Sequence, residues 1–159
     1  MTRLTFACTL LGAAIFTSPV ALADPQDAWK LALQHCIGAF ERIKPVDTSE
    51  MTAADAPDWA PADAETETFL AAPGVYMMIA GEIEEGLASC TVAAEGADVV
   101  DDFKGWAVEA AKAGIYGPVE GEDLTHLETI DWREPRMELK VEVKDGVTWI
   151  HTFEVPKEA

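Results

Sequence analysis

Apolar residues occupy every second position in two consecutive segments near the C-terminal end, residues 137–143 (MELKVEV) and 147–153 (VTWIHTF). In the first segment Met, Leu and Val alternate with Glu and Lys. In the second, Val, Trp, His and Phe alternate with Thr and Ile. A period of two is typical of strands that bury one face. The two segments therefore predict a β-hairpin.

The loop of this hairpin decides which residues share a face. A two-residue Asp145-Gly146 loop would pair Val143 with Thr148 and would place the two apolar sets on opposite faces. A three-residue loop, residues 144–146, pairs Val143 with Val147 and places both sets on one face. A one-residue change of register exchanges the faces completely. Because we expect one core, we predict the three-residue loop with Gly146 in the left-handed conformation.

An amphipathic helix is predicted from residue 24 to Pro45. Asp24 and Pro25 are typical of the N-cap and first helical position. The proline at position 45 ends the helix. The apolar stripe recurs at helical spacing and contains Trp29, Leu33, Cys36, Ile37, Phe40 and Ile43.

A second helix is predicted over residues 98–113. Aspartates occupy its first turn, where the helix dipole favours negative charge, and Gly114 is a natural C-cap. Its apolar stripe contains Val99, Val100, Phe103, Trp106, Ala107 and Ala110.

Residues 75–83 and 87–94 predict another hairpin, and residues 124–132 predict one further strand that ends before Pro135. The expected fold class is therefore α+β: an antiparallel sheet of four to five strands, including two hairpins, with two helices packed on one face and one disulfide. We expect residues 24–159 to form a single acidic domain.

The segment 46–72 has no clear period and contains two prolines, seven acidic residues and no basic residue. We predict a long acidic loop that Trp59 and Phe69 anchor to the domain. Loops of this length are uncommon in small domains and are often functional. This loop is the first place to expect a binding surface.

The first 23 residues have the organisation of a secretory signal peptide. Arg3 precedes an apolar run over residues 4–16, and Ala21-Leu22-Ala23 is typical of a cleavage site after Ala23. The run is shorter than the ~20 residues that span a bilayer. We expect a bacterial protein that is periplasmic or secreted, without membrane insertion.

The chain carries 11 Lys and Arg against 29 Asp and Glu. Arg3 is the only charged residue in the first 23, so removing them changes the net charge from −18 to −19. Such acidity disfavours nucleic acid and anionic membranes as partners, because both are bound through Lys and Arg. Residues 45–103 contain 14 Asp and Glu and no Lys or Arg. They predict either a solvated surface, adapted to salt, or a face for a cationic protein or peptide.

Cys36 and Cys90 are the two cysteines that remain after removal of the signal peptide. In an oxidising compartment, a pair of cysteines predicts a disulfide. Closing the loop between Cys36 and Cys90 stabilises the fold by about 4 kcal/mol in the chain-entropy model. A catalytic thiol pair is less favoured, since the cysteines form no CxxC motif.

The sequence contains no recognisable catalytic or metal-binding motif. Ser49 and Ser89 lack the glycine-flanked nucleophile motif, and the three histidines form neither HExxH nor a Cys/His cluster. No calcium-loop motif occurs. We therefore predict no cofactor, no metal and no catalytic residue. His35 is interpreted as a surface residue, and His151 as either a partly buried histidine or a general base that faces a pocket.

The leading hypothesis is a non-enzymatic binding or interaction module for a cationic protein or peptide. One alternative is a small periplasmic hydrolase that uses carboxylates and His151. Another is an envelope structural accessory protein. The candidate binding surface consists of Trp59, Asp55, Asp58, Asp63, Glu65 and His151.

Overall fold

Eight antiparallel strands form one sheet in the order β1-β2-β3-β4-β8-β7-β6-β5. The computed structural model describes residues 24–60, 65–83 and 88–156; the predicted signal peptide and Asp63 lie outside them. The strands are β1 (Thr52–Ala53), β2 (Glu67–Ala72), β3 (Val75–Ala80), β4 (Ser89–Glu95), β5 (Tyr116–Pro118), β6 (His126–Thr129), β7 (Arg136–Lys144) and β8 (Val147–Val155).

The antiparallel sheet is confirmed, but the predicted number of four to five strands is wrong. β1 and β5 span two and three residues, which is too short to show a period. β2 lies in the segment predicted as a loop, and it forms because its backbone pairs with β3. Short strands at both edges offer few unpaired backbone groups to other chains.

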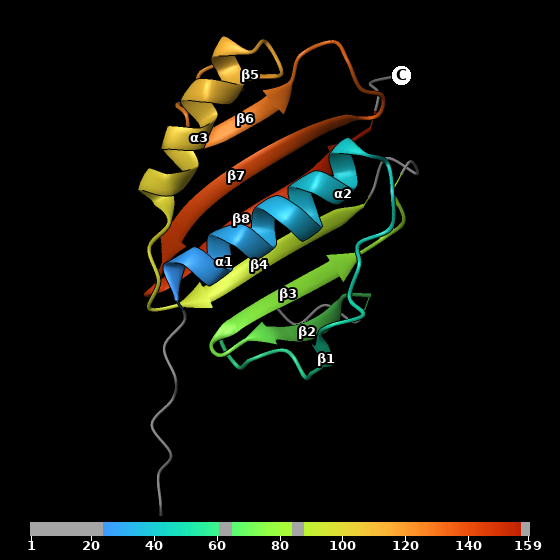
Figure 1. Cartoon of the computed structure of the whole chain (residues 1–159), viewed down its shortest axis with the longest axis vertical. Coiled ribbons are helices and arrows are strands. Elements are labelled where there is room, and N and C mark those ends of the chain that lie inside the picture. Colours follow the sequence, from blue (N-terminus) through green and yellow to red (C-terminus); the bar gives the residue numbers. More distant parts are fainter. Residues whose placement is uncertain (1–23, 61–64, 84–87, 157–159) are drawn as a thin grey trace, which may run out of the picture.

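Two helical regions lie on the same face of the sheet (Figure 1). The first is continuous from α1 (Pro25–Leu31) through the π-helical segment η1 (Ala32–Ile37) to α2 (Gly38–Glu41). The second, α3 (Val100–Lys112), covers the β5–β7 end. The Asp24 carboxylate accepts a hydrogen bond of 2.8 Å from the Gln26 amide, as expected for an N-cap.

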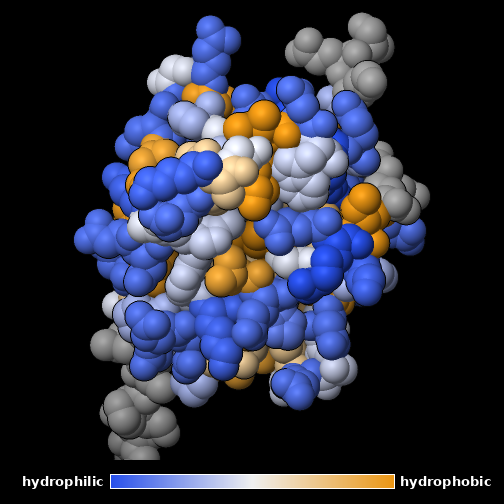
Figure 2. Space-filling view, turned by 45° about the horizontal axis from the view of Figure 1, so that its top comes forward, coloured by the Kyte–Doolittle hydropathy of each residue, from blue (hydrophilic) through white to orange (hydrophobic). Residues whose placement is uncertain are grey.

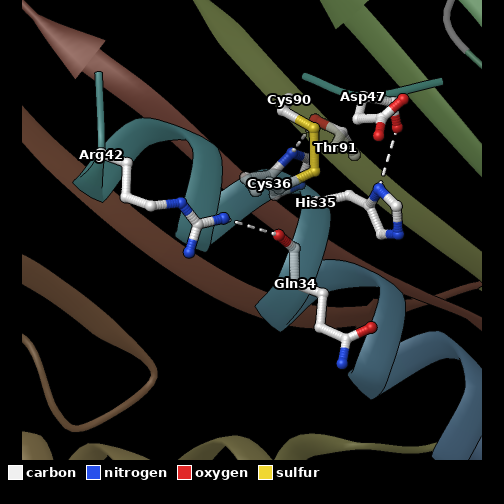
Figure 3. The surroundings of a disulfide bond; sticks show 8 residues. Gln34, His35, Cys36, Arg42, Asp47, Cys90 and Thr91 are labelled. Atoms are coloured by element: carbon white, nitrogen blue, oxygen red, sulfur yellow. Dashed lines mark hydrogen bonds between the residues drawn. A yellow bond between two sulfur atoms is a disulfide. The ribbon is translucent and has the colours of Figure 1, made fainter. Parts of the chain in front are cut away.

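The predicted disulfide is present between Cys36 in η1 and Cys90 in β4 (Figure 3). The two Cα atoms are 5.4 Å apart, and both residues are fully buried. Beside it, His35 Nδ1 is 2.9 Å from the backbone oxygen of Asp47, in the chain that leaves the helix. The disulfide therefore connects the first helical region to the middle of the sheet.

The predicted register of the last hairpin is wrong. Val143 lies opposite Thr148, and Lys144 lies opposite Val147, so the loop has two residues. Both of them, Asp145 and Gly146, have positive φ angles of 53° and 79°, as type I′ turns require. A type I′ turn matches the right-handed twist of the two strands. This preference of the backbone decided the register, although it leaves the two apolar sets on opposite faces.

As a result, the face of β8 that packs against the helix-covered core is the opposite of the predicted one. The helix-covered core receives Ile150 together with three polar residues, Thr148, Thr152 and Glu154, all buried. Their polar groups need partners inside the fold. Thr148 donates a hydrogen bond to the backbone oxygen of Ala97.

The Glu154 carboxylate finds its partner in Arg133, from the loop before β7. The two side chains are 1% and 0% exposed, and the distance from Arg133 Nη2 to Glu154 Oε1 is 2.6 Å. Arg133 Nε also donates a 2.9 Å hydrogen bond to the backbone oxygen of Phe40, at the end of the first helical region. This buried group connects β8, the β6–β7 loop and α2.

Hydrophilic residues cover most of the surface seen in Figure 2, and the hydrophobic residues there form separate patches. The exposed large apolar side chains of the described residues come from several elements rather than from one stripe. No helix in the described ranges is both long and apolar enough to cross a membrane.

Candidate functional site

The second face of the sheet carries no helix among the described residues, and we call it the open face. Residues directly opposite each other on antiparallel strands share a face, so the registers define its members. Its central part contains Tyr76 and Met78 on β3, Thr91 and Ala93 on β4, Trp149, His151 and Phe153 on β8, and Glu138, Lys140 and Glu142 on β7.

Trp59 packs on the open face. Its ring centroid lies 5.6 Å from that of Tyr76 and 5.3 Å from that of Trp149, with interplanar angles of 85° and 87°. We call these three rings the aromatic corner. Trp59 and Trp149 also pack against the buried side chains of Met78, Ala93 and Val147 in a small second core. Trp59 thus holds the acidic segment against the sheet, which agrees with its predicted role as an anchor.

Charged groups border the aromatic corner on β7. Glu142 lies directly opposite Trp149, and its Oε2 is 2.5 Å from Lys140 Nζ. Its other oxygen, Oε1, lies 3.9 Å from His151 Nε2. The hydrogen bond from Lys140 holds the pKa of Glu142 below its ordinary value, so this carboxylate is an anion at neutral pH.

His151 is held between β4 and β7. Its Nδ1 is 3.0 Å from Thr91 Oγ1, and its ring is parallel to that of Trp149, at 5° and 6.0 Å between centroids. The side chain is 29% exposed. Burial lowers the pKa of His151, and this effect exceeds the opposite effect of the Glu142 charge. The imidazole is therefore neutral at pH 7.

These residues surround a pocket of about 190 Å³ on the open face. Its lining combines three rings, one aliphatic side chain and three charged side chains: Trp59, Trp149, His151, Val147, Glu142, Lys144 and Asp145. Small-molecule sites usually measure about 300–1,000 Å³. The pocket is therefore the size of one long side chain rather than of a whole metabolite.

The structure brings together two of the predicted site residues, Trp59 and His151, in the lining of this pocket. Asp55, Asp58 and Glu65 are exposed and do not line it, although they belong to the segment that Trp59 anchors. Asp63 lies outside the described residues.

Sequence reasoning missed Glu142, Asp145 and Trp149 as members of this site. Alternation did place Glu142 on the polar face of its strand. The missing signal was the register, because a two-residue turn brings Glu142 opposite Trp149 whereas the three-residue turn would separate them.

A second polar group lies farther along the open face. Glu138 Oε2 is 2.8 Å from His126 Nε2, and Arg136 lies 2.7 Å from Glu128 and 3.6 Å from Glu138. These four residues come from the neighbouring strands β6 and β7. Since each charge has an opposite partner, this group is best explained as a bridge between the strands.

A larger cavity of about 490 Å³ lies beside the end of α2, and Val46, Thr48 and Glu67 of the acidic segment contribute to its lining. Phe40, Ile79, Ile83 and Ala88 contribute apolar walls, and the charged side chains at its border are exposed. It contains none of the predicted site residues. Although this cavity is larger, the 190 Å³ pocket is the better candidate because aromatic rings and charges converge there.

No group of three His, Cys, Asp or Glu side chains in the described ranges is arranged to hold a metal ion. Comparison of the chain with protein-family models, with curated proteins and with solved structures finds no match.

Proposed function

We propose that this protein is an exported, non-enzymatic binding module for a cationic protein or peptide. The observation that carries the proposal is the position of Trp59, which holds an acidic segment against an open sheet face that already presents Glu142 and Asp145. The binding surface then comprises the acidic segment and the pocket next to it. Packing of an indole on this face also limits the motion that binding would otherwise have to restrict.

The charge distribution supports a basic partner. Residues 45–103 hold 14 Asp and Glu and no Lys or Arg, so this stretch has a high density of negative charge. Asp55 and Asp58 are both exposed on this stretch. Exposed charges of one sign attract an oppositely charged partner over distances of about 10 Å, and salt screens this attraction. Binding should therefore be fast and sensitive to salt.

Calorimetric titration with a synthetic lysine-rich peptide tests this proposal at low and at moderate salt. We expect binding at low salt that weakens as salt increases. The double substitution Asp55→Asn/Asp58→Asn should lower the affinity about threefold to tenfold. The matched control is Glu120→Gln/Glu122→Gln, which removes two exposed carboxylates beyond β5, at the opposite edge of the sheet. No binding at low salt, or equal loss in both variants, would contradict the proposal.

Export into an oxidising compartment is the second part of the proposal. It is supported by the Cys36–Cys90 disulfide and by the sequence of residues 1–23. Mass spectrometry of the protein recovered from the cell envelope or medium should show the loss of 23 residues and of two hydrogens. An intact N-terminus, or two free thiols, would contradict export.

A small hydrolase remains the second candidate, because His151 shares its pocket with Glu142 and Asp145. A catalytic histidine is usually oriented by a neighbouring group within hydrogen-bond reach, about 2.6–3.2 Å. The 3.9 Å separation from Glu142 Oε1 to His151 Nε2 exceeds this range, and Glu142 is already bound by Lys140. Binding is therefore favoured over catalysis. Turnover of chromogenic ester or amide substrates that His151→Ala abolishes would favour the hydrolase, and turnover unchanged by that substitution would exclude it.

A further inference from the structure

We infer that the pocket beside Trp59 takes one arginine side chain of the cationic partner; this inference rests on the proposed function and assigns a residue type to one of its contacts. The pocket volume of about 190 Å³ fits a single long side chain. Its lining offers both of the surfaces that a guanidinium uses, namely aromatic rings and carboxylate oxygens.

The aromatic surface is the first of these features. Trp59 and Trp149 meet at 87° with their centroids 5.3 Å apart, so they form two walls at a right angle. The His151 ring is stacked parallel to Trp149 and also belongs to the pocket lining. A planar guanidinium can stack on an indole face while its stem covers the apolar part of the other wall.

The carboxylates are the second feature. Lys140 binds Glu142 through Oε2, while Oε1 lies 3.9 Å from Nε2 of His151, another residue of the pocket lining. Asp145 adds a second carboxylate from the turn, and Lys144 also contributes to the lining. An arriving guanidinium can donate to Glu142 Oε1 and to Asp145 without displacing Lys140.

Arginine suits this pocket better than lysine for a physical reason. An ammonium is a compact and strongly hydrated charge, and the nearby ammonium of Lys140 already shares Glu142. A guanidinium is more weakly hydrated, spreads its charge over a plane and stacks on aromatic rings. The aromatic corner therefore adds to the affinity for arginine more than for lysine.

The walls of the pocket are also held in place before any ligand arrives. Trp59 packs edge-on against Tyr76, and His151 is bonded to Thr91 at 3.0 Å. Trp149 stands between them on β8, directly opposite Ala93. Because these side chains already have neighbours on β3 and β4, an arginine would enter a formed site, which lowers the entropic cost of binding.

Two synthetic peptides test the inference. They have equal length and equal net charge, are rich in lysine, and differ at one central position that is arginine in the first and lysine in the second. Their dissociation constants are measured at low salt against the full mature protein. We expect the arginine peptide to bind about tenfold more tightly. In Glu142→Gln and in Trp149→Leu this ratio should fall toward one, while the lysine peptide changes little.

The matched control is Glu138→Gln, on the same strand and the same face but outside the pocket lining. It should preserve the tenfold ratio. Glu142→Gln retains the shape of the side chain, so it serves as the second test if Trp149→Leu does not fold. Equal affinities of the two peptides for the wild-type protein, or an unchanged ratio in both pocket variants, would overturn the arginine site while the proposed function stands. If neither peptide binds, the proposed function fails and the arginine site with it.

Discussion

Arg133 and Glu154 form an ion pair inside the core, with 2.6 Å between Nη2 and Oε1 and almost no exposure of either side chain. Arg133 also donates to the backbone oxygens of Phe40 and Pro135. One guanidinium therefore connects the end of the first helical region, the loop before β7 and the last strand. Such pairs are costly to desolvate, so their value depends on both members being present.

Replacing Arg133 alone should therefore destabilise the fold. We expect Arg133→Met to lower the free energy of unfolding by about 3–5 kcal/mol, because the Glu154 carboxylate stays in the core without the charge that offsets it. The double variant Arg133→Met/Glu154→Met should recover most of this loss, since two apolar side chains can pack where the pair was. Urea unfolding of the wild type, both single variants and the double variant measures the coupling. Additive losses in the double variant would contradict this account.

The disulfide should contribute a large share of the stability. We expect Cys36→Ala/Cys90→Ala to lower the free energy of unfolding by about 2–5 kcal/mol, because the unfolded chain regains the entropy of an open 54-residue separation. The loss should be seen as a lower midpoint in thermal unfolding. Comparison with the wild type under a reducing agent separates the entropy of the crosslink from the packing of the two side chains. A double variant as stable as the wild type would show that the helix is held by packing alone.

Stability should depend on pH through His151. Burial lowers its pKa in the folded protein below the ordinary value of 6.5, so below that pH the unfolded chain binds more protons than the folded one. The stability that the neutral imidazole contributes is fully present above pH 6.5. It is lost as the pH falls from 6.5 through the lower pKa of the folded state. The charged groups that face His151 are Glu142 and Lys140, both on β7.

Unfolding measured between pH 5 and 8 in wild type and in His151→Gln tests this effect. Glutamine can still form a hydrogen bond with Thr91 but does not titrate. As the pH falls below 6.5, the wild type should therefore lose stability relative to His151→Gln. A difference that is independent of pH would contradict the prediction.

Thr152 offers a stabilising substitution. Its hydroxyl is fully buried, and no hydrogen-bond partner for it occurs among the described residues. It lies opposite Cys90 and Leu139 under the first helical region. A buried hydroxyl without a partner costs about 1–3 kcal/mol, so Thr152→Val, which keeps the shape, should raise the free energy of unfolding by about 1 kcal/mol. Thr148→Val is the control, and it should destabilise because it removes a hydrogen bond to the Ala97 backbone.

Much of the fold follows from local patterns. The disulfide could be predicted because Cys36 and Cys90 are the two cysteines that remain after the predicted signal peptide, and the apolar stripe places Cys36 toward the core. The N-cap at Asp24 and the helix α3 could also be predicted. The N-cap and the helix depend on residues close in sequence, whose spacing alone defines a face.

The edge strands and the candidate site could not be predicted in the same way. β1 and β5 exist only because a neighbouring strand supplies their hydrogen bonds. The site depends on two segments that are far apart in the sequence: the acidic segment contributes Trp59, and the β7–β8 hairpin contributes Glu142 and Trp149. Trp59 could be suspected from its isolated position in an acidic segment, but nothing near it in the sequence identifies its partners.

The sequence by itself determined the helices, the pairing of Cys36 with Cys90, the acidity of residues 45–103 and the anchoring role of Trp59. Only the tertiary structure decided which side of β8 meets the core. Alternation defines two faces but not which of them is inside. A two-residue turn with two positive φ angles, together with Arg133 to neutralise Glu154, made the polar face of β8 the buried one. That choice placed Trp149 and His151 on the open face beside Glu142, where the candidate site is found.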